Sequence, residues 1–413
     1  MRAPRKIIFA NNYLYVRGGC ERYMFSLAKM LRANRFQVIY FAMQHANNIQ
    51  SEYARYFVNG SDYEQRLPLS QKLLLGINVI FSFEARAKLS KLIAETKPDL
   101  FAFRNIYHHV SPSVLSVVKR HGLPVVMHIA DYNIICPAHT LVRNGTPCEQ
   151  CKGHRYYNAA RYRCLKDSLA LSVLGMVAAY VHHVWRLYDR CVDVIVAPSR
   201  FVRDKLVEFG IDANKITVVP HGLDVDVRDC SSTHDGYILF AGRLAAEKGI
   251  MTLIRAVEAC PEIKLVVAGD GPLKAKLQSY VAGHRIPNVA LVGYKASGDL
   301  EHLIEHAAFV VVPSEWYEAF GLSIYEAFAL GKPVIGSRIG AIPEIIDDGK
   351  NGWLFTPGDV DDLRSKILEL WSAPTRIGQM GRNALEKIST ELSARRNYEA
   401  VSSLYQSLMR EGA

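Results

Sequence analysis

The stretch from residue 309 to residue 331 limits the fold of this chain more than any other. Residues 309–312 are four consecutive apolar side chains, as in the buried strands of parallel sheets. After a polar loop, residues 322–330 place apolar side chains at helical spacing, and Gly331 suits the end of a helix. A strand, a loop and a helix in this order predict the repeating unit of an α/β protein with a parallel sheet.

Two carboxylates lie in this unit, Glu318 in the loop and Glu326 one turn into the predicted helix. The backbone N–H groups of Leu322, Ser323 and Ile324 at the helix start lack intrahelical acceptors and therefore favour a phosphate. A nucleotide sugar, with hydroxyls at both ends and a diphosphate between them, fits this arrangement. For the spacing alone, two solvated glutamates on an ordinary strand–helix unit are the alternative.

A second strand–helix junction in the same half adds cations. The strand predicted at 237–241 is followed by Gly242, Arg243, Lys248 and a further glycine before a helix. Arginine binds a diphosphate as a planar fork and lysine as a point charge, so this loop suits the same ligand. The strand predicted at 288–292 ends at Gly293.

These motifs together resemble the retaining GT-B glycosyltransferases of family 4. Seven residues separate Glu318 from Glu326, as in the E-x7-E motif of that family. The segments G-R-L-x-x-E-K-G, A-G-D-G-P and G-x-x-E-x-x also occur in the family order. The resemblance implies a GT-B fold: two Rossmann-like α/β domains with parallel sheets facing across a cleft. It also implies sugar transfer from a UDP- or GDP-sugar with retention and without a catalytic metal.

Carried over residue by residue, the resemblance assigns a donor site in the second half. Glu326 is expected to bind the ribose, Arg243 and Lys248 the diphosphate, and Glu318 the sugar as the catalytic carboxylate. The remaining donor-binding residues by resemblance are the glycines and helix-start residues Gly242, Gly293, Gly321, Leu322 and Ser323, with the base beside Gly293.

The first half carries weaker candidates at predicted strand ends. Gly18 and Gly19 lie between the first strand and its helix, where glycine lets the backbone approach a donor closely. Asn105, His128 and Asp131 follow the third and fourth strands, where α/β sheets bind ligands; we place Asn105 and Asp131 on the acceptor side. The family usually has histidine directly before the Asp-Tyr pair, whereas here His128 lies two residues further upstream. His128 is therefore either a catalytic substitute or a buried structural histidine.

Four cysteines form a C-x11-C-x2-C-x12-C array within the insert 136–164. Thiols stay reduced in the cytosol, and four thiolates with one C-x-x-C pair suit tetrahedral zinc. Similar cysteine inserts occur in relatives of this family. A structural zinc and four packed thiols remain the two interpretations, and His139 or His154 could replace one ligand. The predicted zinc ligands are Cys136, Cys148, Cys151 and Cys164.

The strand–helix alternation restarts after a polar linker at 229–236, so we expect two domains. The family resemblance implies that the last helix crosses back to the first domain. The predicted segments are an N-terminal acceptor domain at 1–228, a C-terminal donor domain at 235–390 and a returning helix at 391–413.

The charge of the chain is uneven. It totals +10, but residues 1–230 hold 31 Lys and Arg against 18 Asp and Glu, a net +13. No nucleic-acid motif accompanies this charge. No signal peptide or spanning segment is evident, so we expect a cytoplasmic protein. The stretch 165–190 predicts one long amphipathic helix; a core helix is the favoured interpretation, and a membrane-surface helix is the alternative.

Basic residues and tyrosines interleave around the cysteine insert, a composition that suits a membrane–water boundary. We therefore expect peripheral attachment to an anionic inner-leaflet surface and a lipid-linked or phosphorylated glycan acceptor, as in cell-surface polysaccharide or lipopolysaccharide synthesis. A soluble sugar acceptor is the alternative. A GT-B epimerase or phosphorylase and a non-catalytic nucleotide-sugar-binding subunit are the rival functions. The basic residues concerned are Arg143, Lys152, Arg155, Arg161, Arg163, Lys166, Arg186 and Arg190.

Overall fold

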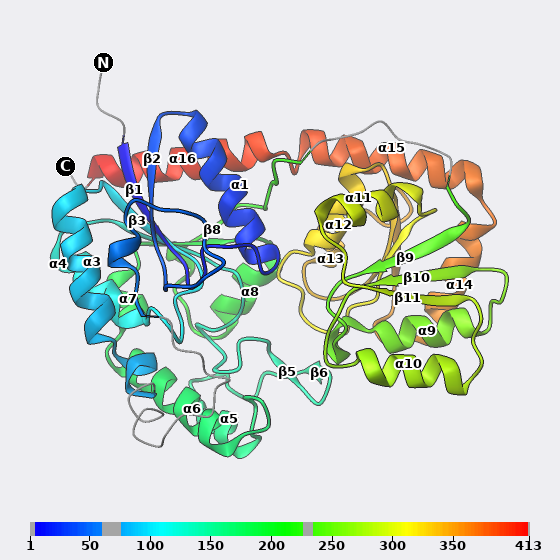
Figure 1. Ribbon diagram of the computed structural model, residues 1–413, viewed down its shortest axis with the longest axis horizontal. Helices are drawn as coiled ribbons and strands as arrows, with labels where there is room; N and C mark the ends of the chain where they lie inside the picture. The colour runs from blue at the N-terminus through cyan, green and yellow to red at the C-terminus, as the bar shows by residue number, and fades with distance from the viewer. Residues whose placement is uncertain (1–4, 60–75, 226–233, 412–413) are drawn as a thin grey trace. The chain divides into compact units, whose positions relative to one another are not determined.

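The computed structural model describes residues 5–59, 76–225 and 234–411. It divides into two compact units, shown in Figure 1. Unit 1 comprises Met1–Leu141, Glu149–Asp224 and Ala394–Ala413, and unit 2 comprises Val142–Cys148 and Val225–Ser393. Most of the predicted linker at 229–236 lies outside the described residues.

Unit 1 is built on a six-stranded parallel sheet in the order β2-β1-β3-β4-β7-β8. Its central strands are buried along their whole length because helices cover both faces, as their continuous apolar sequences predict. The strand order reverses between β1 and β3, and the loops after these two strands meet at that point. The strands are β1 (Arg5–Ala10), β2 (Phe36–Phe41), β3 (Leu100–Phe103), β4 (Val125–His128), β7 (Val194–Ala197) and β8 (Ile216–Val218).

The helices of unit 1 follow their apolar periodicity. Helix α1 buries Met24, Leu27, Ala28 and Leu31, the spacing of one helical face. A short antiparallel hairpin, β5 (Val142–Arg143) with β6 (Thr146–Pro147), interrupts the chain of this unit and is grouped with unit 2. The helices are α1 (Gly19–Ala33), α3 (Phe83–Thr96), α4 (Leu115–Arg120), α5 (Tyr157–Arg161), α6 (Leu169–Val184), α7 (Leu187–Cys191), α8 (Arg200–Glu208) and α16 (Ala394–Glu411), with 3₁₀ turns at Ala54–Tyr56, Pro112–Val114 and Ala213–Lys215.

The last helix, α16, belongs to unit 1 and packs against α1. Its Tyr405 is fully buried, and the Tyr405 hydroxyl lies 2.7 Å from His128 Nε2. One turn from its start, Asn397 donates to the Pro220 carbonyl at 2.7 Å and accepts from the Tyr23 hydroxyl at 3.2 Å. Buried hydrogen bonds near its start and in its second half therefore fix the position of this helix on unit 1.

Unit 2 repeats the architecture with the strand order β11-β10-β9-β12-β13-β14, all parallel. The order reverses between β9 and β12, so the loops after these two strands meet. The strands are β9 (Tyr237–Ala241), β10 (Lys264–Ala268), β11 (Val289–Gly293), β12 (Val310–Val312), β13 (Val334–Ser337) and β14 (Gly352–Phe355). The helices are α9 (Ile250–Glu258), α10 (Lys274–Gly283), α11 (Ser297–His306), α12 (Leu322–Ala329), α13 (Ile342–Ile345), α14 (Val360–Trp371) and α15 (Pro374–Thr390), with a 3₁₀ turn at Ala246–Lys248.

The region predicted as one long core helix at 165–190 differs from the prediction. It forms two helices, α6 and α7, because Arg186 adopts the left-handed conformation with φ of 52° and interrupts the helix. Only Ser172, Ala178 and His182 of α6 are fully buried, so α6 is not a core helix. Among the residues that the structure describes, no helix combines the length and apolar composition needed to span a bilayer.

Candidate functional site

The loops after β9 and β12 meet at the point where the strand order of unit 2 reverses. The Glu315 N–H donates to the Glu247 carbonyl at 2.9 Å, which joins the two loops directly. Gly249 has φ of +65°, and a Cβ there would lie 1.7 Å from the Pro313 carbonyl oxygen. The glycine predicted to precede the helix is therefore required for this close approach.

An ion pair connects the two loops across this junction. Lys248 Nζ donates to Glu318 Oε1, and the Ser314 hydroxyl donates to the same oxygen at 2.8 Å. The Lys248 ammonium also lies 4.9 Å from the centre of the Trp316 ring, a cation–π distance. Two residues far apart in sequence, both predicted for the donor site, are thus brought together.

Glu318 is almost fully buried, with 7% of its surface exposed. Burial on its own raises the pKa of Glu318, but the charge of Lys248 and the hydrogen bonds from Lys248 and Ser314 outweigh it. The net effect lowers the pKa of Glu318, so its carboxylate is ionised at neutral pH. A buried, ionised carboxylate can accept hydrogen bonds from sugar hydroxyls.

The loop that carries Glu318 is held by its neighbours. The Ala341 N–H donates to the Glu318 carbonyl at 2.9 Å. The Ser337 hydroxyl, at the end of β13, donates to the Ser314 carbonyl at 2.5 Å. Gly340 has φ of +61°, and a Cβ there would lie 2.5 Å from the Glu318 backbone nitrogen. The segment after β13 therefore holds the backbone of the loop that carries Glu318.

Helix α12 begins directly after this loop. Gly321, with φ of +91°, precedes its first residue. The Ile324 N–H donates to the Gly321 carbonyl at 3.0 Å, so the prediction that it is available to a phosphate was wrong. No acceptor among the described residues is recorded for the N–H groups of Leu322 and Ser323, which leaves them at the open end of the helix. Glu326 lies one turn further on and is half-buried.

Arg243 and the glycine loops complete this end of the sheet. Gly242 and Arg243 follow β9 and are exposed, and within the described residues the Arg243 guanidinium has no recorded partner. The Gly242 N–H donates to the Ala268 carbonyl at 3.0 Å, and the Gly269 N–H donates to the Gly293 carbonyl at 2.8 Å. The ends of β9, β10 and β11 are thus linked side by side, with Gly293 at the third strand.

In unit 1 the loops after β1 and β3 meet in the same manner. The Asn105 N–H donates to Asn11 Oδ1 at 3.1 Å, and the Asn12 N–H donates to the Asn105 carbonyl. Gly18 is exposed and directly precedes α1, which starts at Gly19. The structure therefore places the two glycines and Asn105 at one end of the unit 1 sheet.

Asp131 and His128 have different environments. Burial raises the pKa of Asp131 to about 6, although the Asn133 N–H, the Arg104 charge and hydrogen bonds from Asn105 and Tyr107 act in the opposite direction. A carboxyl that titrates near neutral pH at a strand end is a candidate functional group. His128 is buried with Nε2 beside Tyr405, and burial with the Arg104 charge lowers its pKa to about 3. This geometry favours the structural interpretation of His128.

Arg104 was not singled out from the sequence. Only 2% of it is exposed, and its guanidinium lies 4.5 Å from the Tyr23 ring centre. Its Nη2 lies 3.5 Å from His221 Nε2, and its Nε donates to Cys20 Sγ at 3.4 Å. Because these partners are neutral, the buried charge of Arg104 raises the electrostatic potential around Asp131. The burial of Arg104 is visible only in the folded structure.

The structure does not support the predicted zinc site at the four cysteines of the insert. In the described parts of the chain, no group of three or more His, Cys, Asp or Glu side chains is arranged to hold a metal ion. Cys148 ends the hairpin segment grouped with unit 2, whereas the other three cysteines lie in unit 1. His154 stacks on His183 at 3.8 Å, so it is engaged elsewhere. Cys136 and Cys151 are buried, and Cys148 and Cys164 are half-buried.

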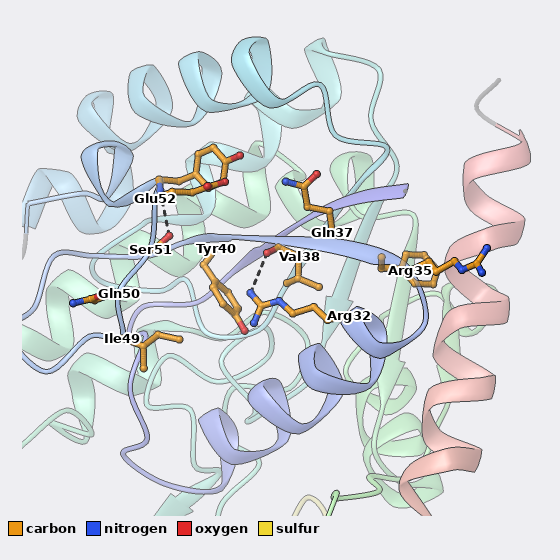
Figure 2. Close-up of a pocket in the computed structure, with 11 residues that line it drawn as sticks. Arg32, Arg35, Gln37, Val38, Tyr40, Ile49, Gln50, Ser51 and Glu52 are labelled. Carbon is orange, nitrogen blue, oxygen red and sulfur yellow. Dashed lines mark hydrogen bonds between the residues drawn. The ribbon is translucent and has the colours of Figure 1, made fainter. Parts of the chain in front are cut away.

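A separate pocket lies beside the edge strand β2 (Figure 2). It measures about 540 Å³ and includes Arg32, Tyr40 and Glu52 in its lining. Arg32 Nη2 donates to the Val38 carbonyl at 3.1 Å, and its guanidinium lies 4.8 Å from the Tyr40 ring centre. None of the residues predicted for the site lines this pocket, so it is not part of the candidate site.

Each of the two α/β units has loops that meet where its strand order reverses, the usual place for a ligand in proteins of this class. Sequence comparison gives the family. The model described as Glycosyltransferase Family 4 matches residues 17–227, just over half of the chain. The model described as Glycosyl transferases group 1 matches residues 231–387. The chain therefore belongs to glycosyltransferase family 4.

Individual relatives are distant. A glycosyltransferase of Methanocaldococcus jannaschii is 30% identical over 216 residues, covering 51% of this chain and 60% of that protein. A 42.6 kDa protein from the cps region of Klebsiella pneumoniae is 25% identical over 323 residues, covering 75% of this chain and 79% of that protein. The crystal structure of Anabaena HepE in complex with UDP matches with a TM-score of 0.69 and 19% identity, covering 97% of this chain and all of that chain. This likeness confirms the predicted GT-B fold.

Proposed function

We propose that the protein is a retaining glycosyltransferase that transfers a sugar from a UDP- or GDP-sugar to a glycan or a lipid-linked glycan. The observation that carries the proposal is the Lys248–Glu318 pair at the strand-order reversal of unit 2, with Arg243 exposed in the loop after β9. The two cations suit the diphosphate of such a donor, and the ionised carboxylate suits the hydroxyls of its sugar. Family membership and the UDP bound by the Anabaena protein of the same fold support this choice.

The proposed chemistry needs no metal ion. The bond between the sugar and the diphosphate breaks, a bond to the acceptor oxygen forms, and the nucleotide diphosphate leaves with the negative charge. Arg243 and Lys248 stabilise that charge, together with the N–H groups of Leu322 and Ser323 at the start of α12. Lys248 has three N–H donors, so it can keep its bond to Glu318 while it binds a phosphate oxygen.

The remaining donor contacts divide between the two glutamates. Glu318 accepts hydrogen bonds from the sugar hydroxyls and orients the reacting carbon, which makes it the proposed catalytic carboxylate. Glu326, eight positions further on, binds the ribose hydroxyls. Gly242 and Gly293 leave room for the nucleotide at the ends of β9 and β11. The exposed N-terminal end of α1, with Gly18 and Gly19, is proposed to contribute to the donor site as well.

The acceptor is proposed to bind unit 1. Asp131 is its best-supported residue, because a pKa of about 6 lets this carboxylate take a proton from an acceptor hydroxyl near neutral pH. Asn105 is a hydrogen-bond partner of Asp131 and orients it. His128 remains a doubtful candidate for catalysis, because its ring is buried against Tyr405.

The biological setting proposed is cell-surface polysaccharide or lipopolysaccharide synthesis in the cytoplasm, at the inner face of the plasma membrane. The Klebsiella relative from a cps region supports a polysaccharide pathway. The net charge of +13 in residues 1–230 supports an anionic surface or acceptor.

The deciding experiment is a panel of UDP- and GDP-sugars incubated with the full chain, with hydrolysis and transfer measured for each. We expect one donor to be turned over, with retained configuration at the transferred carbon. Glu318→Gln should reduce turnover more than it reduces nucleotide binding. Nucleotide-sugar binding without turnover would favour a non-catalytic subunit, and isomerisation of the bound sugar would favour an epimerase.

A further inference from the structure

Helix α6 exposes several apolar side chains to solvent, while two of its polar side chains are buried against the protein. Val173, Val177 and Val184 are separated by four and seven positions and form one stripe, which we call the outer stripe. Their exposed fractions are 38%, 37% and 72%. Ser172 and His182, by contrast, are buried. This is the reverse of the arrangement expected for a surface helix of a protein in water.

The orientation of α6 is fixed by its inner face. The His182 ring nitrogen Nε2 donates to the Ile80 carbonyl at 2.9 Å, and the Leu165 N–H donates to the Ser172 hydroxyl at 3.0 Å. Gly175 lies on the same side, where a Cβ would approach Leu165 to 3.1 Å. Turning the helix over would break both hydrogen bonds and force larger side chains into this contact. The packing of the inner face therefore determines that the outer stripe is exposed.

Aromatic side chains extend the outer stripe at the C-terminal end of α6. Trp185 follows the helix and is 46% exposed, and Phe83 at the start of α3 is 72% exposed. The ring of Phe81 lies between them, with ring centres 5.8 Å from Trp185 and 4.7 Å from Phe83. Figure 1 shows α6 and α5 together at one end of unit 1. Tryptophan and phenylalanine beside aliphatic side chains are typical of protein surfaces at a membrane interface.

Charge identifies the kind of partner. Between residues 152 and 190 the chain has seven Lys and Arg against two Asp, a net +5. Arg161, Arg163 and Arg190 are exposed near the two ends of α6. Two copies of this surface would bring like charges together, which disfavours self-association through it. An anionic bilayer offers both an apolar interior and negative headgroups.

We propose that the outer stripe of α6, with Trp185 and Phe83, inserts into the headgroup–acyl boundary of an anionic membrane, while the flanking arginines contact lipid headgroups. The inference deepens the proposed attachment to a membrane and rests on it, but it assigns the attachment to apolar side chains that charge alone does not identify. It does not depend on which sugar is transferred.

The test is co-sedimentation of the full chain with vesicles of phosphatidylethanolamine and phosphatidylglycerol, with phosphatidylcholine vesicles as the neutral reference. The triple variant Val173→Ser/Val177→Ser/Val184→Ser should lower the partition coefficient by about tenfold or more. The matched control Val207→Ser/Leu368→Ser changes two side chains that are each 39% exposed on other helices, and it should bind as the wild type does. Thermal unfolding and UDP binding confirm that each variant is folded.

A second readout does not depend on the triple variant. Insertion should shift Trp185 emission to shorter wavelength when anionic vesicles are added, and the shift should be absent in Trp185→Phe. UDP binding and donor hydrolysis are measured in parallel, so loss of the proposed transferase activity is recognised separately from loss of membrane binding.

Three results would overturn the inference. In the first, the triple variant binds vesicles like the wild type while Arg161→Gln/Arg163→Gln/Arg190→Gln binds less, so attachment is electrostatic only. In the second, the wild type does not bind vesicles and sediments as a dimer, whereas the triple variant sediments as a monomer. The stripe would then join two copies of the chain. In the third, the wild type neither binds vesicles nor associates.

Discussion

Replacing Lys248 with methionine tests the central pair of the candidate site most directly. Methionine keeps most of the length and apolar surface of lysine but removes the charge that Glu318 contacts. Glu318 would remain almost fully buried, with the Ser314 hydroxyl still bonded to its carboxylate. Breaking a buried ion pair by removing one partner costs about 3–5 kcal/mol. Since the Lys248 side chain is 26% exposed, we expect a loss of about 2–4 kcal/mol in the free energy of unfolding.

The pH dependence of stability should change sign in this variant. In the wild type the pKa of Glu318 is lowered, so its ionised form stabilises the fold at neutral pH and that contribution is lost as pH falls through the folded pKa. Without Lys248, burial would raise the pKa of Glu318. The ionised carboxylate would then destabilise the fold at neutral pH, and the variant would recover stability relative to wild type as the pH falls toward about 4.5.

The assay is urea unfolding of wild type, Lys248→Met, Glu318→Gln and the double variant at several pH values. The double variant should be more stable at neutral pH than Lys248→Met alone, because it has no unpaired buried charge. Nucleotide binding should be weakened in Lys248→Met and in the double variant. If Lys248→Met loses less than about 0.5 kcal/mol and shows the wild-type pH profile, the pair does not hold the loops as described.

The remaining predictions concern single groups. Arg243→Ala should weaken UDP or GDP binding by about 1.5–3 kcal/mol without changing thermal stability, whereas Arg285→Ala, another exposed arginine of unit 2, should leave binding unchanged by calorimetry. Tyr405→Phe should lower the free energy of unfolding by about 1–2 kcal/mol, because it leaves His128 Nε2 buried without its partner. Asp131→Asn should reduce turnover yet raise stability at pH 7, since the folded pKa of about 6 exceeds the unfolded value of about 3.9; this gain should disappear below about pH 4. Metal analysis of the reduced protein should find less than one zinc per chain.

Most of the fold could be predicted because its strands are short, apolar and separated by helices of regular period. The strand predicted after the linker, at 237–241, is β9 as observed, and the helix predicted after Gly321 is α12. Most strands pair with the next strand along the chain, but the sequence pattern does not show that β3 pairs with β1 or that β12 pairs with β9. That order decides the site, because it brings the loops after β9 and β12 together.

The structure places Lys248 and Glu318, which the sequence singled out, in two loops that meet, but the sequence did not show their contact. Glu318 bonds Lys248 and Ser314, and only the fold shows that the lysine is its partner. Arg104 shows the opposite limitation. It follows an apolar strand in a sequence that gives no sign of whether its side chain points outward or inward, and the fold buries it against Tyr23. Burial of a charged side chain depends on tertiary packing, which local sequence does not encode.

Helix α6 shows how far periodicity can mislead. An apolar stripe at helical spacing indicates that one face of a helix avoids water, and a core is the usual place for such a face. Periodicity does not say whether protein or lipid covers it. In α6 the decisive groups are the polar and small residues on the other face: Ser172, Gly175 and His182 make the close contacts and hydrogen bonds with unit 1. A helix that buries such residues leaves its valines for a different environment, and the arginines near its ends fit the proposed anionic membrane surface.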